Sequence, residues 1–282
     1  MASFNIKSAY DNAWSPEFFG CESFDSKLTK AIKDFQRENG LTVDGLCGKK
    51  TVALLKKNGA YPMNNKNYIY CGPKAVEIKW DKVIIWTEKY AAKKYRANYD
   101  DRQPRLFINH WDAALSSASC HKILSDRGLS CHFLIDNDGT IIQCANTSHI
   151  TYHAGNSNRY SIGCEISNAY YTRYQDRYIS KGYGERPIIK NAYVHGKKMR
   201  DHLGFYPVQL EALKALWVAI SSYYDIPIDT PADENGNEIT TLYNPAFSTY
   251  KGFVHHYQVS SNKIGCGGLD LTKLVDEINS KN

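Results

Sequence analysis

The stretch Leu106-Phe107-Ile108-Asn109-His110 is a short apolar run that ends in a histidine. An apolar run of this length predicts a buried β-strand. Similar strand signals recur at residues 83–86, 131–135, 140–143, 161–167 and 253–254. The turn residues Asp136-Asn137-Asp138-Gly139 separate two of these strands and predict a hairpin between them.

A long helix is predicted after Pro207, because apolar residues recur at helical spacing at positions 210, 213, 217 and 220. Proline suits the first turn of a helix. Strands with helices between them favour an α/β fold. The sequence therefore predicts one domain over residues 76–282, in which a central mixed β-sheet is flanked by helices.

A small helical unit is predicted ahead of this domain. Asp25 and Ser26 can cap a helix with apolar residues at 28, 31, 32 and 35, and Asn39-Gly40 ends it. A loop leads to a second helix around Val52, which Asn58-Gly59 closes. We expect a helical domain over residues 1–66 and a linker to about residue 75, while the first 23 residues show no assignable pattern.

Composition narrows the class of protein. The chain has 282 residues and a net charge of +6, and its 43% hydrophobic and 23% charged residues are ordinary for a soluble globular protein. The charge is too small to indicate nucleic acid, but it is compatible with an anionic bacterial wall. No apolar run approaches the roughly 20 residues that span a bilayer, and no signal-peptide pattern is visible. We expect a monomer that is synthesised in the cytoplasm.

The eight cysteines allow two interpretations, four disulfides or free thiols, and the second is favoured without a signal peptide. His110 and His256 each end an apolar strand, and Cys266 follows His256 by ten residues in a glycine-rich loop. Two imidazoles and a thiolate are good zinc ligands, and a catalytic zinc keeps a fourth position for water. The alternative is a pair of hydrogen-bonded core histidines and an ordinary buried thiol.

Five ordered blocks of sequence surround these residues. They are Phe107-Ile108-Asn109-His110, Cys131-His132-Phe133-Leu134-Ile135-Asp136, Tyr152-His153-Ala154-Gly155, Ser161-Ile162-Gly163-Cys164-Glu165-Ile166, and Val254-His255-His256-Tyr257-Gln258-Val259-Ser260 with Cys266. Together they resemble the type-2 N-acetylmuramoyl-L-alanine amidase family, which includes phage endolysins and peptidoglycan-recognition proteins. Residues 24–57 likewise resemble a peptidoglycan-binding helical module, although a generic helix hairpin is the alternative there.

The resemblance implies zinc as the cofactor, held by His110, His256 and Cys266. His255 is the rival to His256, and only one of two neighbouring strand residues can face the metal. The resemblance also implies that Lys263 stabilises an oxyanion and that His153 and Asn109 line the substrate groove. The alternatives are a surface lysine at 263 and a hydrogen-bonded structural histidine at 153. Two departures from the family pattern are Cys131, where many relatives have tyrosine, and Lys263, which lies one residue further from Cys266 than usual.

Glu165 matches the catalytic acid of the family, and its position in the chain supports this role. Ile162, Cys164 and Ile166 alternate onto one strand face, which leaves Glu165 on the other. A carboxylate in an otherwise apolar strand is costly unless it is paired or lies in a cleft, and desolvation there raises its pKa. The alternative is a solvent-exposed strand glutamate.

The resemblance implies a zinc-dependent hydrolase that cleaves the amide bond between N-acetylmuramic acid and L-alanine of the stem peptide in bacterial peptidoglycan, as in wall lysis by a phage endolysin. The alternatives are a peptidoglycan-binding protein without activity, a wall endopeptidase, and a structural wall-anchoring protein. Residues 170–205 form a long insertion, either a rim over the groove or a solvated loop.

Overall fold

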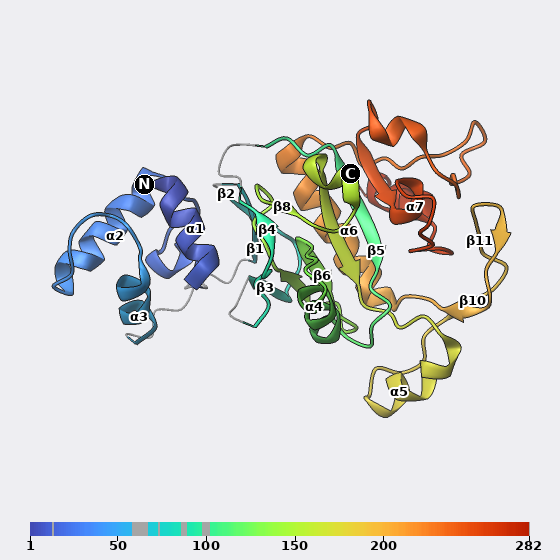
Figure 1. The fold of residues 1–282 in the computed structure, drawn as a ribbon, viewed down its shortest axis with the longest axis horizontal. Coiled ribbons are helices and arrows are strands. Elements are labelled where there is room, and N and C mark those ends of the chain that lie inside the picture. The colour runs from blue at the N-terminus through green and yellow to red at the C-terminus, as the bar shows by residue number, and fades with distance from the viewer. Residues whose placement is uncertain (13, 58–66, 73, 86–88, 98–101, 282) are drawn as a thin grey trace.

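The computed structural model describes residues 1–12, 14–57, 67–72, 74–85, 89–97 and 102–281. Its first part is a helical unit of α1 Ala2–Asn12, the 3₁₀ turn η1 Pro16–Phe19, α2 Ser26–Glu38 and α3 Lys49–Lys57 (Figure 1). Asp25 caps α2 as expected, because its Oδ1 accepts hydrogen bonds from the backbone N–H groups of Lys27 and Leu28 at 2.9 and 3.1 Å. The predicted end of the second helix at Asn58-Gly59 lies outside the described residues.

The second part is built on a six-stranded sheet with the order β14-β5-β9-β6-β7-β3. The sheet is mixed, which confirms the prediction of a central mixed sheet. The strands are β3 Val83–Ile85, β5 Leu106–Trp111, β6 Phe133–Ile135, β7 Ile141–Gln143, β9 Ser161–Ile166 and β14 Gly252–His255. Neighbouring strands run parallel except β6 and β7, which are antiparallel. The predicted hairpin turn joins this pair, and Gly139 adopts φ +79° there, a conformation that favours glycine.

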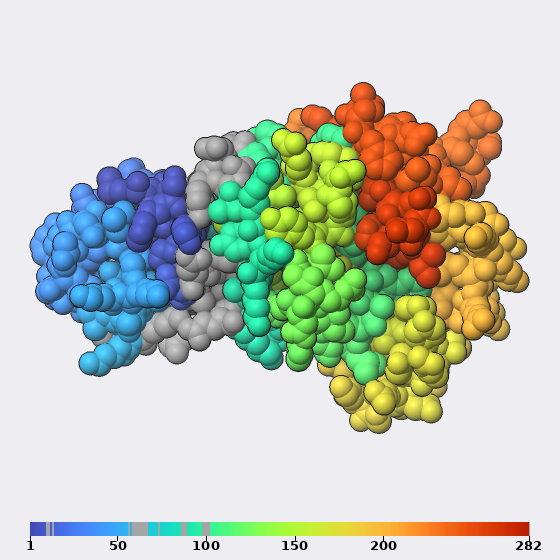
Figure 2. Space-filling view, in the orientation of Figure 1, coloured from blue at the N-terminus to red at the C-terminus, as the bar shows by residue number. Residues whose placement is uncertain are grey.

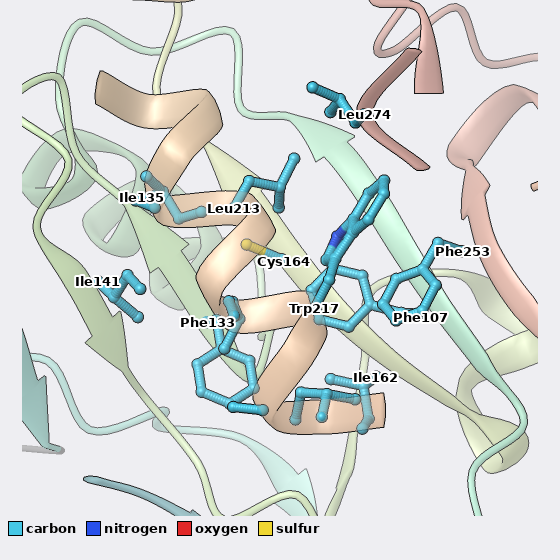
Figure 3. Packing of buried hydrophobic residues seen from close by; sticks show 14 of the residues in the cluster. Phe107, Phe133, Ile135, Ile141, Ile162, Cys164, Leu213, Trp217, Phe253 and Leu274 are labelled. Carbon is cyan, nitrogen blue, oxygen red and sulfur yellow. The ribbon is translucent and has the colours of Figure 1, made fainter. Parts of the chain in front are cut away.

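One face of the sheet is covered by α6 Pro207–Tyr224 and α7 Leu271–Asn279, as Figure 3 shows for the central part of this core. Trp217 of α6 stacks on Phe253 of β14 with ring centroids 4.5 Å apart, and Phe253 contacts Phe107 of β5 at 5.4 Å. Ile162, Cys164 and Ile166 of β9 belong to the same core, which confirms the predicted alternation along that strand.

The opposite face carries α4 Ser117–Asp126, whose buried Cys120 packs in one core with Leu134 and Ile142 of the sheet. Cys131 and Cys144 belong to this core too. All eight cysteines are free thiols and seven of them are buried, which confirms the interpretation as thiols rather than disulfides.

The other elements are short. They are β1 Tyr68–Cys71, β2 Lys74–Glu77, β4 Tyr95–Arg96, β8 Ile150–Thr151, η2 Gly155–Tyr160, η3 Thr172–Tyr174, α5 Gln175–Ser180, β10 Ile188–Ile189, β11 Tyr193–Val194, β12 Lys197–Lys198, β13 His202–Leu203, η4 Asn244–Phe247 and η5 His256–Gln258. Within the ranges that the structure describes, no helix is both long and apolar enough to cross a membrane.

The helical unit packs directly on the sheet domain, through the segment where the sequence predicts a linker. β1 lies in that segment and pairs with β2, and the Ala75 N–H donates to the Glu22 carbonyl at 2.8 Å. The rings of Phe24 and Tyr70 meet at 5.7 Å, within a core that both parts share. In the space-filling view this unit forms one end of an elongated molecule, and the insertion at residues 170–205 lies toward the other end (Figure 2).

Candidate active site

The site begins with two neighbouring parallel strands. β5 and β9 pair with His110 opposite Glu165, and residues paired in this way share a face of the sheet. Glu165 Oε1 lies 3.8 Å from His110 Nδ1. The alternation of side chains along β9 therefore brings a carboxyl group to the histidine that the sequence singles out.

His256 joins this pair from the next strand. β14 ends at His255, and His256 begins the 3₁₀ turn η5, so the chain changes direction between the two histidines. The Nδ1 atoms of His256 and His110 are 2.9 Å apart. His255 lies on the other side, where its Nε2 contacts Glu238 Oε1 and the Leu269 carbonyl, each at 3.0 Å. Of the two neighbouring histidines, the structure brings His256 to the site.

His153 is the third imidazole of the cluster. Its Nδ1 lies 2.9 Å from His110 Nε2, and its Nε2 lies 3.3 Å from Ser161 Oγ. Gly163 makes room for this ring, because a Cβ at position 163 would lie 2.6 Å from His153 Cγ. His110 is therefore held between two imidazoles, one at each of its ring nitrogens.

These groups line a pocket of about 290 Å³ at the ends of the strands. Lys263 reaches the same pocket from the loop after η5. The walls also include Asp112 and Arg127, which the sequence did not suggest, together with Tyr152 of the third sequence block and Tyr170 at the start of the insertion. Asp112 had a visible signal, because it is an acidic residue just past the end of an apolar strand.

Burial makes the three imidazoles poor bases. It lowers the pKa of His110 well below the usual range, with help from the neighbouring His256 and His153. Burial, and to a smaller extent Lys263, lowers the pKa of His256 to about 4. Burial likewise lowers the pKa of His153 to about 3. All three rings are therefore neutral near pH 7, with nitrogen lone pairs free for hydrogen bonds or metal ions.

The carboxyl groups shift in the opposite direction. Burial and the nearby Asp112 raise the pKa of Glu165 to about 8, against the opposing effect of Lys263. Burial raises the pKa of Asp112 to about 7, although the backbone N–H groups of Asn168 and Ala114 favour its charged form. A carboxyl group that titrates near neutral pH is suited to general acid–base catalysis.

The structure does not bring Cys266 to this pocket. The pocket wall includes Gly265, but the Cys266 side chain is fully buried in the core that α6 and α7 share with the opposite face of the sheet. The Cys266 N–H donates to His255 Nδ1 at 3.4 Å, so these two residues lie together away from His110. Burial raises the pKa of the Cys266 thiol well above its usual range.

The glycines around Cys266 have a packing role. A Cβ at Gly265 would lie 2.7 Å from Trp111 Cβ, and one at Gly267 would lie 2.8 Å from Val194 Cγ2. A Cβ at Gly268 would lie 2.6 Å from Ile189 Cγ2. The loop is therefore glycine-rich because β5 and the insertion approach its backbone closely.

Asn109 also lies away from the pocket. Its amide nitrogen donates to the Val254 carbonyl at 3.0 Å, and its oxygen accepts from Trp217 Nε1 at 3.3 Å. The side chain is fully buried and connects β5 to β14 and α6. In this arrangement it supports the site and does not contact a ligand in the pocket.

The donor set fits part of a zinc site. Two ligand nitrogens of a tetrahedral zinc with Zn–N bonds of about 2.0–2.1 Å lie roughly 3.3 Å apart, and the Nδ1 atoms of His110 and His256 are close to this separation at 2.9 Å. Across the described ranges, no three His, Cys, Asp or Glu side chains are arranged to hold a metal ion. The structure thus assembles two nitrogen donors, and the third predicted donor, Cys266, faces the other side of the sheet.

The structure has a sheet domain that carries the histidine and glutamate cluster, preceded by a helical unit, and family comparison gives its class. Residues 100–264 match the family model described as N-acetylmuramoyl-L-alanine amidase, and residues 22–55 match the model described as putative peptidoglycan binding domain. The first match spans more than half of the chain. The chain belongs to the N-acetylmuramoyl-L-alanine amidase family.

Solved structures show weaker similarity. The amidase endolysin LysCS from Clostridium intestinale URNW is 15% identical, with 70% of this chain and 95% of that chain covered and a TM-score of 0.43. AmiA of Staphylococcus aureus, in complex with its ligand, is 16% identical, with 72% and 84% covered and a TM-score of 0.42. The Ph2119 endolysin from a Thermus scotoductus MAT2119 bacteriophage is 12% identical, with 70% and 99% covered and a TM-score of 0.39. No curated protein matches the chain in sequence.

Proposed function

We propose that this family member is a zinc-dependent peptidoglycan hydrolase that cleaves the amide bond between N-acetylmuramic acid and the L-alanine of the stem peptide. The observation that carries the proposal is the contact of His110 with His256 and Glu165 in one pocket of an amidase-family domain. In this proposal His110 and His256 supply two of the zinc ligands. When bound, zinc polarises the scissile carbonyl and lowers the pKa of water.

Glu165 is the proposed proton carrier. Its carboxylate takes a proton from the attacking water at Oε1, and the carboxylic acid formed in this way donates the proton to the leaving amine of L-alanine. Its place in the pocket, 3.8 Å from His110, puts it beside the proposed zinc ligands, where the attacking water would be bound. Lys263, at the pocket wall, supplies a cation for the oxyanion that develops on the carbonyl.

The experiment is a digest of purified peptidoglycan, followed by mass analysis of the soluble products. An amidase releases intact stem peptides with a free L-alanine amino group, whereas an endopeptidase leaves L-alanine on the glycan. We expect Glu165→Gln to lower kcat by about 10²- to 10⁴-fold while it leaves the fold unchanged. Full activity of this variant would remove Glu165 from the mechanism.

Zinc content tests the ligands separately from activity. We expect purified wild-type protein to contain one zinc ion per chain and His110→Ala or His256→Ala to lose it. Cys266→Ser is expected to retain zinc if the thiol stays in the core shared with α6 and α7, as in the structure, and to lose it if Cys266 is the third ligand. Wild-type protein without bound zinc, even after zinc is supplied, would contradict the metal dependence.

The biological role that we propose is lysis of the bacterial wall, as by a phage endolysin, with synthesis in the host cytoplasm. The support is the combination in one chain of an amidase-family domain with a region that matches a peptidoglycan-binding family. A wall-binding module raises the local concentration of a catalytic domain at a polymeric substrate. The test is to add the purified protein to bacterial cells from outside. We expect wild-type protein to lyse the cells and the Glu165→Gln variant to leave them intact.

A further inference from the structure

A second and larger pocket adjoins the candidate active site. It has a volume of about 650 Å³ and lies between the insertion and the loop that follows η5. Four residues line both pockets, namely Tyr170, Asn262, Lys263 and Ile264. A molecule held at His110 and Glu165 can therefore extend past Lys263 into this second pocket.

The second pocket is strongly basic. Its walls carry five cationic side chains, Arg173, Lys197, Lys198, Arg200 and Lys263, and one carboxylate, Asp201. The formal charge of this lining is +4, compared with +6 for the whole chain, so most of the excess positive charge is concentrated here. Among the ion pairs found in the described part of the chain, none uses these five cations. The pocket has an electrostatic preference for an anionic ligand.

An aromatic wall connects the basic pocket to the active site. The rings of Tyr170 and Tyr171 stack with centroids 4.2 Å apart, and Tyr170 also contacts Trp111 of β5 at 4.6 Å. The Arg173 guanidinium lies over the Tyr171 ring at 4.6 Å. The wall thus offers a flat apolar surface with a cation beside it, which suits a short peptide that has carboxylates along its backbone.

The insertion is held in place rather than free in solvent. His195 Nε2 contacts the Lys263 carbonyl at 3.1 Å, and His202 Nε2 contacts the Gly267 carbonyl at 3.0 Å. Arg186 anchors its base, since this side chain is only 2% exposed and lies between the rings of Tyr178 and Tyr206 at 4.3 and 4.2 Å. A pocket with fixed walls loses little conformational entropy when it binds a ligand.

We propose that this pocket is the subsite for the carboxylate-bearing part of the stem peptide; the proposal rests on the proposed function. In the substrate, the lactyl carboxyl of muramic acid is consumed in the scissile amide and the neighbouring N-acetyl sugars are neutral. The free carboxylates near the cleavage point therefore belong to the peptide, on its D-glutamate and at its C-terminus. The basic pocket selects stem peptides whose carboxylates are free over those whose carboxylates are amidated.

Binding of cleavage products tests the proposal without any catalysis. The ligands are the free stem tetrapeptide L-Ala-γ-D-Glu-L-Lys-D-Ala and the same tetrapeptide with both carboxylates converted to carboxamides, measured by calorimetry at low ionic strength. We expect wild-type protein to bind the peptide with free carboxylates at least tenfold more tightly than the amidated peptide. The preference shrinks in 0.5 M NaCl, because salt screens exposed charges.

Two double variants locate the effect. Lys197→Gln with Lys198→Gln removes two cations of the pocket, and we expect a loss of roughly 4- to 25-fold in affinity for the peptide with free carboxylates, about 2- to 5-fold for each cation. Affinity for the amidated peptide, which carries two ammonium groups and no carboxylate, does not fall. Lys79→Gln with Lys251→Gln is the matched control, because both side chains are exposed, lie in the sheet domain and line neither pocket, so that both affinities should stay unchanged.

Equal affinities of the wild-type protein for the two tetrapeptides would overturn the proposal. An equal effect of the two double variants on affinity for the peptide with free carboxylates would also overturn it. The proposed amidase function is judged independently by the digest of peptidoglycan. Selective binding without digestion would therefore contradict the proposed function alone, and digestion without selective binding would contradict the subsite alone.

Discussion

Gly163 gives the sharpest test of how the site is built. Its backbone φ lies outside the left-handed region, so alanine is compatible with the strand at this position. The added Cβ would lie 2.6 Å from Cγ and 2.7 Å from Cε1 of His153, whereas carbon atoms in contact are about 3.5–4.0 Å apart. In Gly163→Ala the His153 ring must therefore move by roughly 1 Å, away from its contact with His110.

The expected cost follows from these contacts. Overpacking of a filled interior costs about 1–3 kcal/mol, and a lost hydrogen bond of a buried group adds about 1 kcal/mol. We expect Gly163→Ala to lower the free energy of unfolding by about 2–4 kcal/mol, which corresponds to a fall in Tm of roughly 5–15 °C. Chemical denaturation followed by circular dichroism measures the loss, and wall digestion measures the accompanying fall in activity.

A double-mutant cycle isolates the cause. In a His153→Ala background the obstructing ring is gone, so Gly163→Ala is expected to be neutral or to stabilise the protein by up to about 1 kcal/mol. The coupling between the two substitutions should then be at least about 2 kcal/mol. A Gly163→Ala variant as stable as wild type, or strictly additive effects in the cycle, would refute the packing argument.

Two further predictions concern the supports of the fold. Arg186→Met removes a buried guanidinium that donates to the Ser167 carbonyl at 2.9 Å, and we expect a loss of about 2–4 kcal/mol because buried partners are left without a donor. Limited proteolysis should then cut within residues 170–205, while resistance equal to that of wild type would contradict the anchoring role. Phe24→Ala removes the ring that contacts Tyr70, and we expect it to lower the stability of both parts by about 3–5 kcal/mol in one calorimetric transition. Two separate transitions, with only the helical unit affected, would show that the parts fold independently.

Part of the fold and site could be predicted from the sequence because it depends on local periodicity. Alternation along residues 161–166 places Glu165 opposite the apolar face of its strand, and the structure has that arrangement. Capping by Asp25 and the turn before Thr140 involve neighbours in the chain, so their chemistry is visible locally. By contrast, α1 has no such signal, because Asn5 is fixed by tertiary hydrogen bonds to the backbone of Gly45 and Cys47.

Side chains return to the same face every two residues in a strand and every 3.6 residues in a helix. From these periods the sequence by itself determined the mixed sheet, the helical unit in front of it, and the strands that carry His110 and Glu165. Only the tertiary structure decided which of His255 and His256 meets His110, because the chain turns into η5 between them. It likewise placed Cys266 in the core shared with α6 and α7, while the insertion packs against the backbone of its glycine-rich loop. The physical reason is that the conformation of a loop depends on the surfaces packed against it, and those surfaces come from segments far away in the chain.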